Sequence, residues 1–176
     1  MDTNIKRFDL TIPILKTSSK EIDVFDEEGL LFGVIQRKYQ NYFLWMLGKI
    51  AEVDVGTVFK VNNQVVVSSK NQPLKSIFSR YKWKVADSRY ELEYEVKETN
   101  KIRTNWKFEF IISDVKYIMT GNMGVTNVHL YKSDNQMGVM NLSASVPRKA
   151  SLELSEDENL NYEALICLFY TVYLVM

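Results

Sequence analysis

The C-terminal segment, residues 162–176, constrains the fold most, because it is an almost unbroken apolar run. Glu163 is its only charged residue, and Thr171 is its only other strongly polar one. The run has the length of a buried helix and is somewhat short for a membrane span. A helix that is apolar on every face cannot lie on a protein surface and must be enclosed on all sides. The rest of the chain therefore has to surround it.

Composition indicates one soluble globular domain that spans residues 1–176. Of the 176 residues, 46% are hydrophobic and 12% are aromatic, which is enough for a sizeable core. The 22 basic and 22 acidic residues cancel, so no overall field draws the chain to nucleic acid or to an anionic membrane. We therefore expect no nucleic-acid partner, and any binding to anionic lipid has to be local.

Two features of the sequence favour a reducing, cytoplasmic location. Cys167 is the single cysteine and cannot form an intramolecular disulfide. The first residues also lack the basic-then-apolar order of a signal peptide. We expect a cytoplasmic protein that can also lie peripherally at a membrane.

Strand signals dominate the chain from residue 20 to residue 146. Short segments rich in β-branched and aromatic residues alternate with polar turns such as Asn62-Asn63, which tolerates left-handed backbone. Residues 90–97 alternate strictly, so one face of that strand is buried. The predicted strands are residues 20–25, 30–36, 57–61, 65–69, 81–85, 89–97, 105–112, 115–120, 127–132 and 137–146.

Strands at this spacing suggest a sandwich or a barrel. A sandwich has no room between its sheets for an all-apolar helix, whereas the inward residues of a wide barrel can enclose one. We therefore predict a mainly β fold, a closed antiparallel barrel around a central C-terminal α-helix. Ser155 and Glu158 have capping-box spacing, which predicts a helix start near residues 156–159.

Residues 35–50 suggest an additional helix, because their apolar side chains recur at helical spacing. Two interpretations stay open for it. Its basic edge fits an interfacial helix that presses aromatic residues into a membrane. The alternative, which we favour, is a segment packed on the barrel, because Leu44 and Trp45 interrupt the polar face. The apolar positions are Ile35, Tyr39, Tyr42, Phe43, Met46, Leu47 and Ile50.

Catalytic and metal-binding signatures are weak. His129 is the only histidine, and Cys167 lies within the apolar run, so neither has a second histidine or cysteine to complete a site. Residues 157–163 begin like a calcium-binding loop, but Tyr162 stands where such a loop needs glycine and Leu168 where it needs glutamate. We expect no catalytic residues, no metal site, no cofactor and no enzymatic activity.

One basic cluster is a candidate binding site for a phosphate or a lipid headgroup. Strand alternation places Arg80, Lys82 and Lys84 on one face and Tyr81 and Trp83 on the other. Three cations can then line up outside the barrel and hold a phosphate, although ordinary solvated lysines would give the same pattern. The full candidate set is Lys75, Arg80, Lys82, Lys84 and Arg89.

The order of elements near the C-terminus resembles that of a known family. A strand, a polar turn, a strand, a charged segment (148–154), an acidic stretch and an apolar helix follow one another through residues 131–176, with weaker support from residues 22–32 and 106–121. This resembles the tubby-like superfamily, which includes the tubby proteins, the phospholipid scramblases and the LURP-one-related proteins, and it looks like a bacterial-type member. The resemblance implies an antiparallel barrel of about twelve strands around a central hydrophobic helix.

For function, the resemblance implies a non-catalytic module. Tubby proteins bind phosphoinositide headgroups with basic residues on the barrel surface, so we expect an anionic phospholipid or a protein partner to bind the barrel exterior. One alternative is a small-molecule carrier or an enzyme with its site at the barrel mouth. A lumen filled by its own chain argues against it. Another is that residues 162–176 form a tail anchor, but no basic residue follows them, and we expect no transmembrane span.

Overall fold

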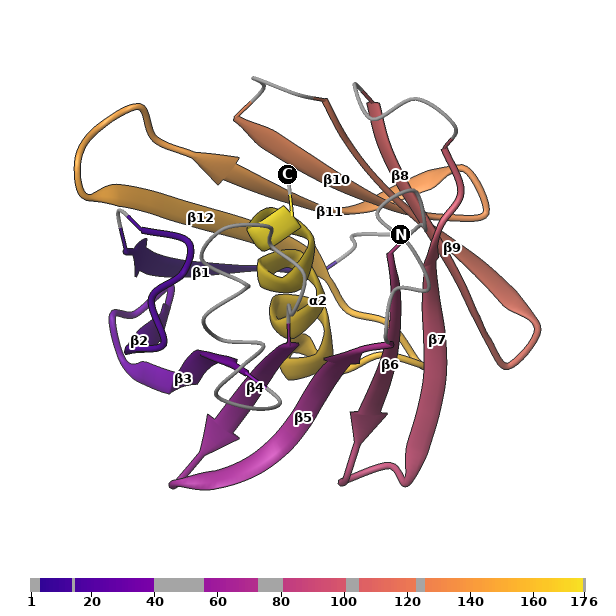
Figure 1. Cartoon of the computed structure of the whole chain (residues 1–176), viewed down its shortest axis with the longest axis horizontal. Coiled ribbons are helices and arrows are strands. Elements are labelled where there is room, and N and C mark those ends of the chain that lie inside the picture. The colour runs from indigo at the N-terminus through magenta and orange to yellow at the C-terminus, as the bar shows by residue number, and fades with distance from the viewer. Residues whose placement is uncertain are drawn as a thin grey trace.

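The computed structural model describes residues 4–13, 15–39, 56–72, 81–100, 105–122 and 126–175. Twelve antiparallel strands form a closed barrel, and one helix, α2 (Tyr162–Val175), runs through its lumen (Figure 1). The strands are β1 (Ile5–Ile12), β2 (Glu21–Asp26), β3 (Leu31–Lys38), β4 (Gly56–Val61), β5 (Gln64–Asn71), β6 (Lys82–Asp87), β7 (Leu92–Glu98), β8 (Asn105–Ile112), β9 (Val115–Asn122), β10 (Asn127–Lys132), β11 (Asn135–Leu142) and β12 (Arg148–Ser155). The predicted mainly β barrel with a central C-terminal helix is thus confirmed.

Each strand pairs with its neighbour in sequence, and β1 closes the ring by pairing with β12. Their register runs from Ile5 opposite Ser155 to Ile12 opposite Arg148. Neither strand was among the predicted segments, and residues 148–154 are not merely a charged segment but most of β12. Lys149 and Glu153 occupy outward positions, while Ala150, Leu152 and Leu154 alternate inward and are buried. In the sequence, the charged residues of β12 obscured the alternation of its apolar residues.

Helix α2 is the centre of the core. Every side chain from Glu163 to Val175 is buried, because the inward residues of the strands surround the helix. At β11, a Cβ on Gly138 would lie 3.3 Å from the ring of Phe169. No helix among the described residues has both the length and the apolar character needed to cross a bilayer. The C-terminal run therefore serves as the core of the barrel.

The helix begins later than residues 156–159, so the predicted start is wrong. Asn161 is the N-cap: its Oδ1 accepts a hydrogen bond of 2.7 Å from the backbone N–H of Ala164. Ser155 is the last residue of β12, and the Glu158 carboxylate lies 3.3 Å from Lys132 Nζ rather than on the helix backbone. The linker between Ser155 and Tyr162 turns the chain from the barrel wall into the lumen.

The two ends of the barrel differ. The tight turns that follow β2, β4, β6, β8 and β10 all lie at the rim where α2 begins, which we call the entry rim. The predicted Asn62-Asn63 turn is among them, with both residues at positive φ (50° and 62°). The opposite exit rim, where α2 ends, carries the connections after β1 and β11.

Of the helix predicted over residues 35–50, residues 35–38 belong to β3 and residues 40–50 lie outside the described residues.

Truncation of a central side chain of α2 tests whether the barrel depends on its filled lumen. We expect Phe169→Ala to lower the free energy of unfolding by roughly 3–5 kcal/mol, since it leaves a cavity between the helix and β11. Urea denaturation followed by circular dichroism measures the change. Ile111→Ala, at an exposed position of β8, is the control and should stay within about 0.5 kcal/mol of the parent. Equal effects of the two substitutions would contradict the central role of α2.

Candidate functional site

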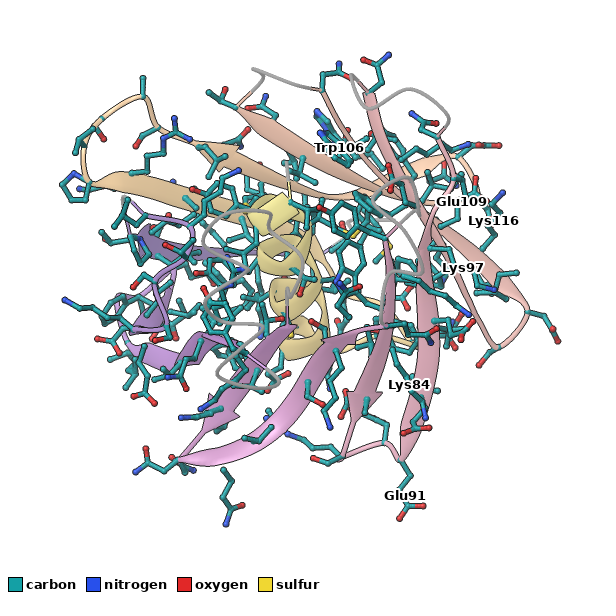
Figure 2. All side chains as sticks on the ribbon, viewed as in Figure 1. Lys84, Glu91, Lys97, Trp106, Glu109 and Lys116 are labelled. Carbon is teal, nitrogen blue, oxygen red and sulfur yellow. The ribbon has the colours of Figure 1, made fainter. Side chains whose placement is uncertain are left out.

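Lysines cover the outer face of strands β5 to β9. Inward positions of these strands carry buried residues, so the alternate positions face solvent. Figure 2 shows Lys84, Lys97 and Lys116 on this side of the barrel, together with Glu109. We call the surface the lysine face; its cations are Lys70, Lys82, Lys84, Lys97, Lys107 and Lys116.

Three glutamates hold most of these lysines in place. Glu95 is shared between Lys82 and Lys97, with N–O distances of 2.8 and 3.2 Å. Glu109 is likewise shared between Lys107 and Lys116, both at 2.9 Å. A carboxylate shared by two ammonium groups neutralises only one of them. Each such trio therefore keeps a net positive charge.

The third glutamate, Glu93, pairs with Lys84 alone, at 2.6 Å. Lys70 stands opposite Lys84 in the register of β5 and β6, so a further cation lies next to this pair. Like charges on facing positions repel each other, and an anion that settles between them would relieve this repulsion. The lysine face thus has more cations than its own glutamates neutralise.

Glu95 and Glu109, the two shared glutamates of the lysine face, stay ionised well into acid. Hydrogen bonds from Lys82, Gln72 and Lys97 lower the pKa of Glu95 to about 2. Hydrogen bonds from Lys116 and Lys107 also lower the pKa of Glu109. Both carboxylates therefore remain charged at neutral pH and keep the lysine ammonium groups in fixed positions.

The structure separates the residues of the predicted basic cluster. Lys82 and Lys84 lie on the lysine face as the alternation predicts, and Tyr81 and Trp83 are buried and stack with ring centroids 5.6 Å apart. Arg89 lies instead in the β6–β7 turn, where its Nη2 is 2.6 Å from Oε1 of the nearly buried Glu163. It thereby ties the turn to the first turn of α2. Lys75 and Arg80 lie outside the described residues.

Sequence reasoning missed Lys70, Lys97, Lys107 and Lys116. In the sequence, glutamates near Lys97 and Lys107 make the local charge look balanced. Only the strand register shows that Lys97 lies opposite Lys82 and that Lys97 and Glu109 face each other across β7 and β8. Marking the outward position of each predicted strand and aligning the hairpins at their turns would have revealed part of this face.

Charge is also distributed unevenly along the barrel axis. Acidic residues gather at the entry rim, where the positive end of the α2 dipole lies. Cations gather at the exit rim around the helix C-terminus, where Lys16 Nζ lies 5.1 Å from the ring of Tyr173. The barrel thus complements the dipole of its own helix at both ends. The acidic set is Asp26, Glu27, Glu28, Glu156, Asp157 and Glu158, and the basic set is Lys16, Lys20, Arg37, Lys38, Arg148 and Lys149.

One ion pair of the entry rim fixes the linker that precedes α2. Lys132 Nζ lies 2.7 Å from Oδ2 of the buried Asp157 carboxylate, and this bond raises the pKa of Lys132. The hydroxyl of Tyr117 donates a 2.9 Å hydrogen bond to the other carboxylate oxygen, and the backbone N–H of Asn159 also donates to it. These contacts hold the linker at the end of β10, where α2 enters the lumen.

The lumen holds a small polar cluster between β4, β5 and α2. Thr57 Oγ1 lies 2.5 Å from Thr171 Oγ1 and 3.1 Å from Cys167 Sγ, and Ser69 Oγ lies 2.9 Å from each of the two threonine hydroxyls. All four residues are buried, and they satisfy one another in an apolar surrounding. Burial raises the pKa of the Cys167 thiol to about 12. The thiol therefore carries no nucleophilic thiolate at neutral pH.

Thiol chemistry tests this placement. We expect Cys167 of the native protein to react with a disulfide reagent at pH about 8 far more slowly than an exposed cysteine, and at the normal rate once the chain is unfolded in guanidinium. The release of the coloured thiol measures the reaction. A fast reaction in the native state would contradict burial of the α2 face that bears Cys167.

Lysine substitutions test the charge coupling of the lysine face. We expect Lys82→Ala to raise the pKa of Glu95 from about 2 towards its ordinary value of 4.5, because Lys82 lowers it most. Since the native pKa is depressed, the stability that this pair adds is present above pH about 4.5 and is lost as the pH falls towards 2. An NMR titration of the Glu95 side chain measures the shift. Lys149→Ala, on β12, should leave this pKa unchanged.

Comparison with known proteins agrees with the observed architecture. The family model of the Tubby C-terminal like domain matches residues 8–176, which covers the strands from within β1 through β12 and all of α2. No curated protein matches the sequence, and no solved structure matches it either. A closed twelve-stranded antiparallel barrel around a buried C-terminal helix is the architecture that the resemblance implied, and the chain belongs to the Tubby C-terminal like domain family.

Proposed function

We propose that this chain is a non-catalytic module that binds the headgroups of anionic phospholipids through its lysine face. The observation that carries the proposal is the sharing of Glu95 and Glu109 between two lysines each, which leaves positive charge on a surface of regular strands. Lysine ammonium groups bind phosphate oxygens as compact point charges. A membrane surface presents many such anions in one plane.

The proposed binding depends on the summed attraction of several lysines to the membrane surface. Each lysine close to an anionic bilayer contributes about 1 kcal/mol, and the attraction falls off within a Debye length. Lys82, Lys97 and Lys107 lie on the neighbouring strands β6, β7 and β8, so these cations can approach one surface together. The shared glutamates hold the ammonium groups in place and reduce the entropy that binding would otherwise cost.

The filled lumen favours this proposal over a small-molecule site at the barrel mouth. Aromatic and aliphatic side chains of α2 occupy the space in which ligand-binding barrels hold their ligands. A hollow of about 540 Å³ lies on the exterior instead, over β1, β11 and β12, and solvent has open access to it. The filled lumen thus supports a binding role for the outer surface.

Liposome flotation tests the proposal. We expect the protein to float with vesicles that contain phosphatidylserine and to stay in solution with pure phosphatidylcholine vesicles. The triple variant Lys82→Ala, Lys97→Ala, Lys107→Ala should bind about a hundredfold more weakly, since about 3 kcal/mol of attraction is removed. High salt should have a similar effect on the parent protein.

A charge-matched control separates the lysine face from overall charge. The variant Lys6→Ala, Arg7→Ala, Lys38→Ala also removes three cations, but from β1 and β3 on the other side of the barrel. It should float almost as well as the parent. Equal losses in both triple variants would assign binding to net charge alone, and the absence of flotation in the parent would refute the proposal.

A further inference from the structure

An apolar projection flanked by acidic residues stands at the entry-rim end of the β2–β3 hairpin. Leu30 and Leu31 are each 60% exposed, and Phe25 is 40% exposed. Phe25 lies opposite Leu31 in the register, at a bulge, so their side chains lie together on the outer face. Glu27 and Glu28 in the adjoining turn are exposed. We call Phe25, Leu30 and Leu31 the apolar knob.

An apolar groove flanked by basic residues lies at the other end of the same hairpin. It has a volume of about 550 Å³, and its apolar walls come from Pro13, Leu15, Ile22 and Pro147. Leu15 is 69% exposed. Lys20 lines the groove directly, and Lys149 stands opposite Thr11, another lining residue, in the β1–β12 register.

The knob and the groove carry opposite charges. Carboxylates of Glu27 and Glu28 border the exposed apolar side chains of the knob, and ammonium groups of Lys20 and Lys149 border the groove. Within the part of the chain that the structure describes, Glu27, Glu28, Lys20 and Lys149 form no ion pair. The one acid in the groove lining, Glu21, is already held by Lys60 at 2.5 Å, so it does not cancel the charge of Lys20.

Because they lie at opposite ends of one hairpin, the knob and groove of a single molecule cannot meet. We infer that the apolar knob of one copy docks into the groove of a second copy, so that the chain associates head to tail. The occupant is a second copy because this chain itself supplies a surface with the required apolar side chains and the opposite charge. Projection and pocket at different places on one molecule make a heterologous contact, which leaves a free knob at one end and a free groove at the other.

The contact is small and partly electrostatic, so it is weak, depends on concentration and is screened by salt. Its residues differ from those of the lysine face, and the inference goes beyond lipid binding without depending on it. A knob–groove contact along the hairpin leaves the outer face of β5–β9 on the other side of the barrel uncovered.

Sedimentation velocity over a range of protein concentrations tests the inference. In low salt, the average mass should rise with concentration above the monomer mass of 20.6 kDa, and high salt should return it to the monomer. The knob variant Leu30→Ser, Leu31→Ser should remain monomeric throughout. The control Ile111→Ser removes an equally exposed apolar side chain, 62% exposed, from the β8–β9 hairpin and should associate like the parent.

Mixing two variants, neither of which can associate by itself, gives a more specific test. The knob variant keeps its groove, and a groove variant, Lys20→Glu with Lys149→Glu, keeps its knob. Each alone should be monomeric, and the mixture should form one-to-one dimers that do not grow further. Thermal unfolding monitored by circular dichroism verifies that both variants are folded, as their exposed positions lead us to expect.

The possible outcomes of these experiments either support or overturn head-to-tail association. Association that increases with concentration, is lost in both variants, persists in Ile111→Ser and is restored as dimers in the mixture supports the inference. A parent protein that stays monomeric at low salt overturns it. Association that survives in the knob variant, or a mixture that stays monomeric while the parent associates, also overturns it, because the contact then uses other surfaces or a symmetric interface.

Discussion

Burial of a helix that is apolar on every face is the constraint on which this structure depends. Such a helix is stable only inside a complete apolar wall, and a ring of twelve strands supplies that wall. Each fully buried large apolar side chain contributes about 1.5–3 kcal/mol, so α2 adds much of the hydrophobic stabilisation. The filled lumen leaves the outer surface and the rims for interactions with other molecules.

Much of this fold could be predicted from local patterns. Strand alternation and polar turns located β2 to β11, and the all-apolar run located α2, because both signals are contained in short stretches of sequence. The closing strands β1 and β12 were missed because their outward charges obscured a short alternation that only their long-range pairing makes clear. The helix start was misplaced because Asn161, not Ser155, meets the first free backbone N–H groups.

The candidate site was less predictable than the fold, because it depends on register between strands. Alternation correctly placed Lys82 outside and Trp83 inside, since it concerns neighbours within one strand. The sharing of Glu95 by Lys82 and Lys97 depends on how β6 aligns with β7, and Arg89 was displaced from the cluster by a turn that directs it to Glu163. A chain with zero net charge can thus carry separate acidic and basic regions, and its amino-acid composition does not reveal them.

Closure of the barrel by its first and twelfth strands has a consequence for biosynthesis. The β1–β12 pairing joins residues that are far apart in the sequence, and α2 leaves the ribosome only after all twelve strands have been made. Until then the inward faces of the strands remain uncovered, so the nascent chain exposes an apolar surface that is prone to aggregation. The barrel can therefore close only after β12 and α2 have both been synthesised.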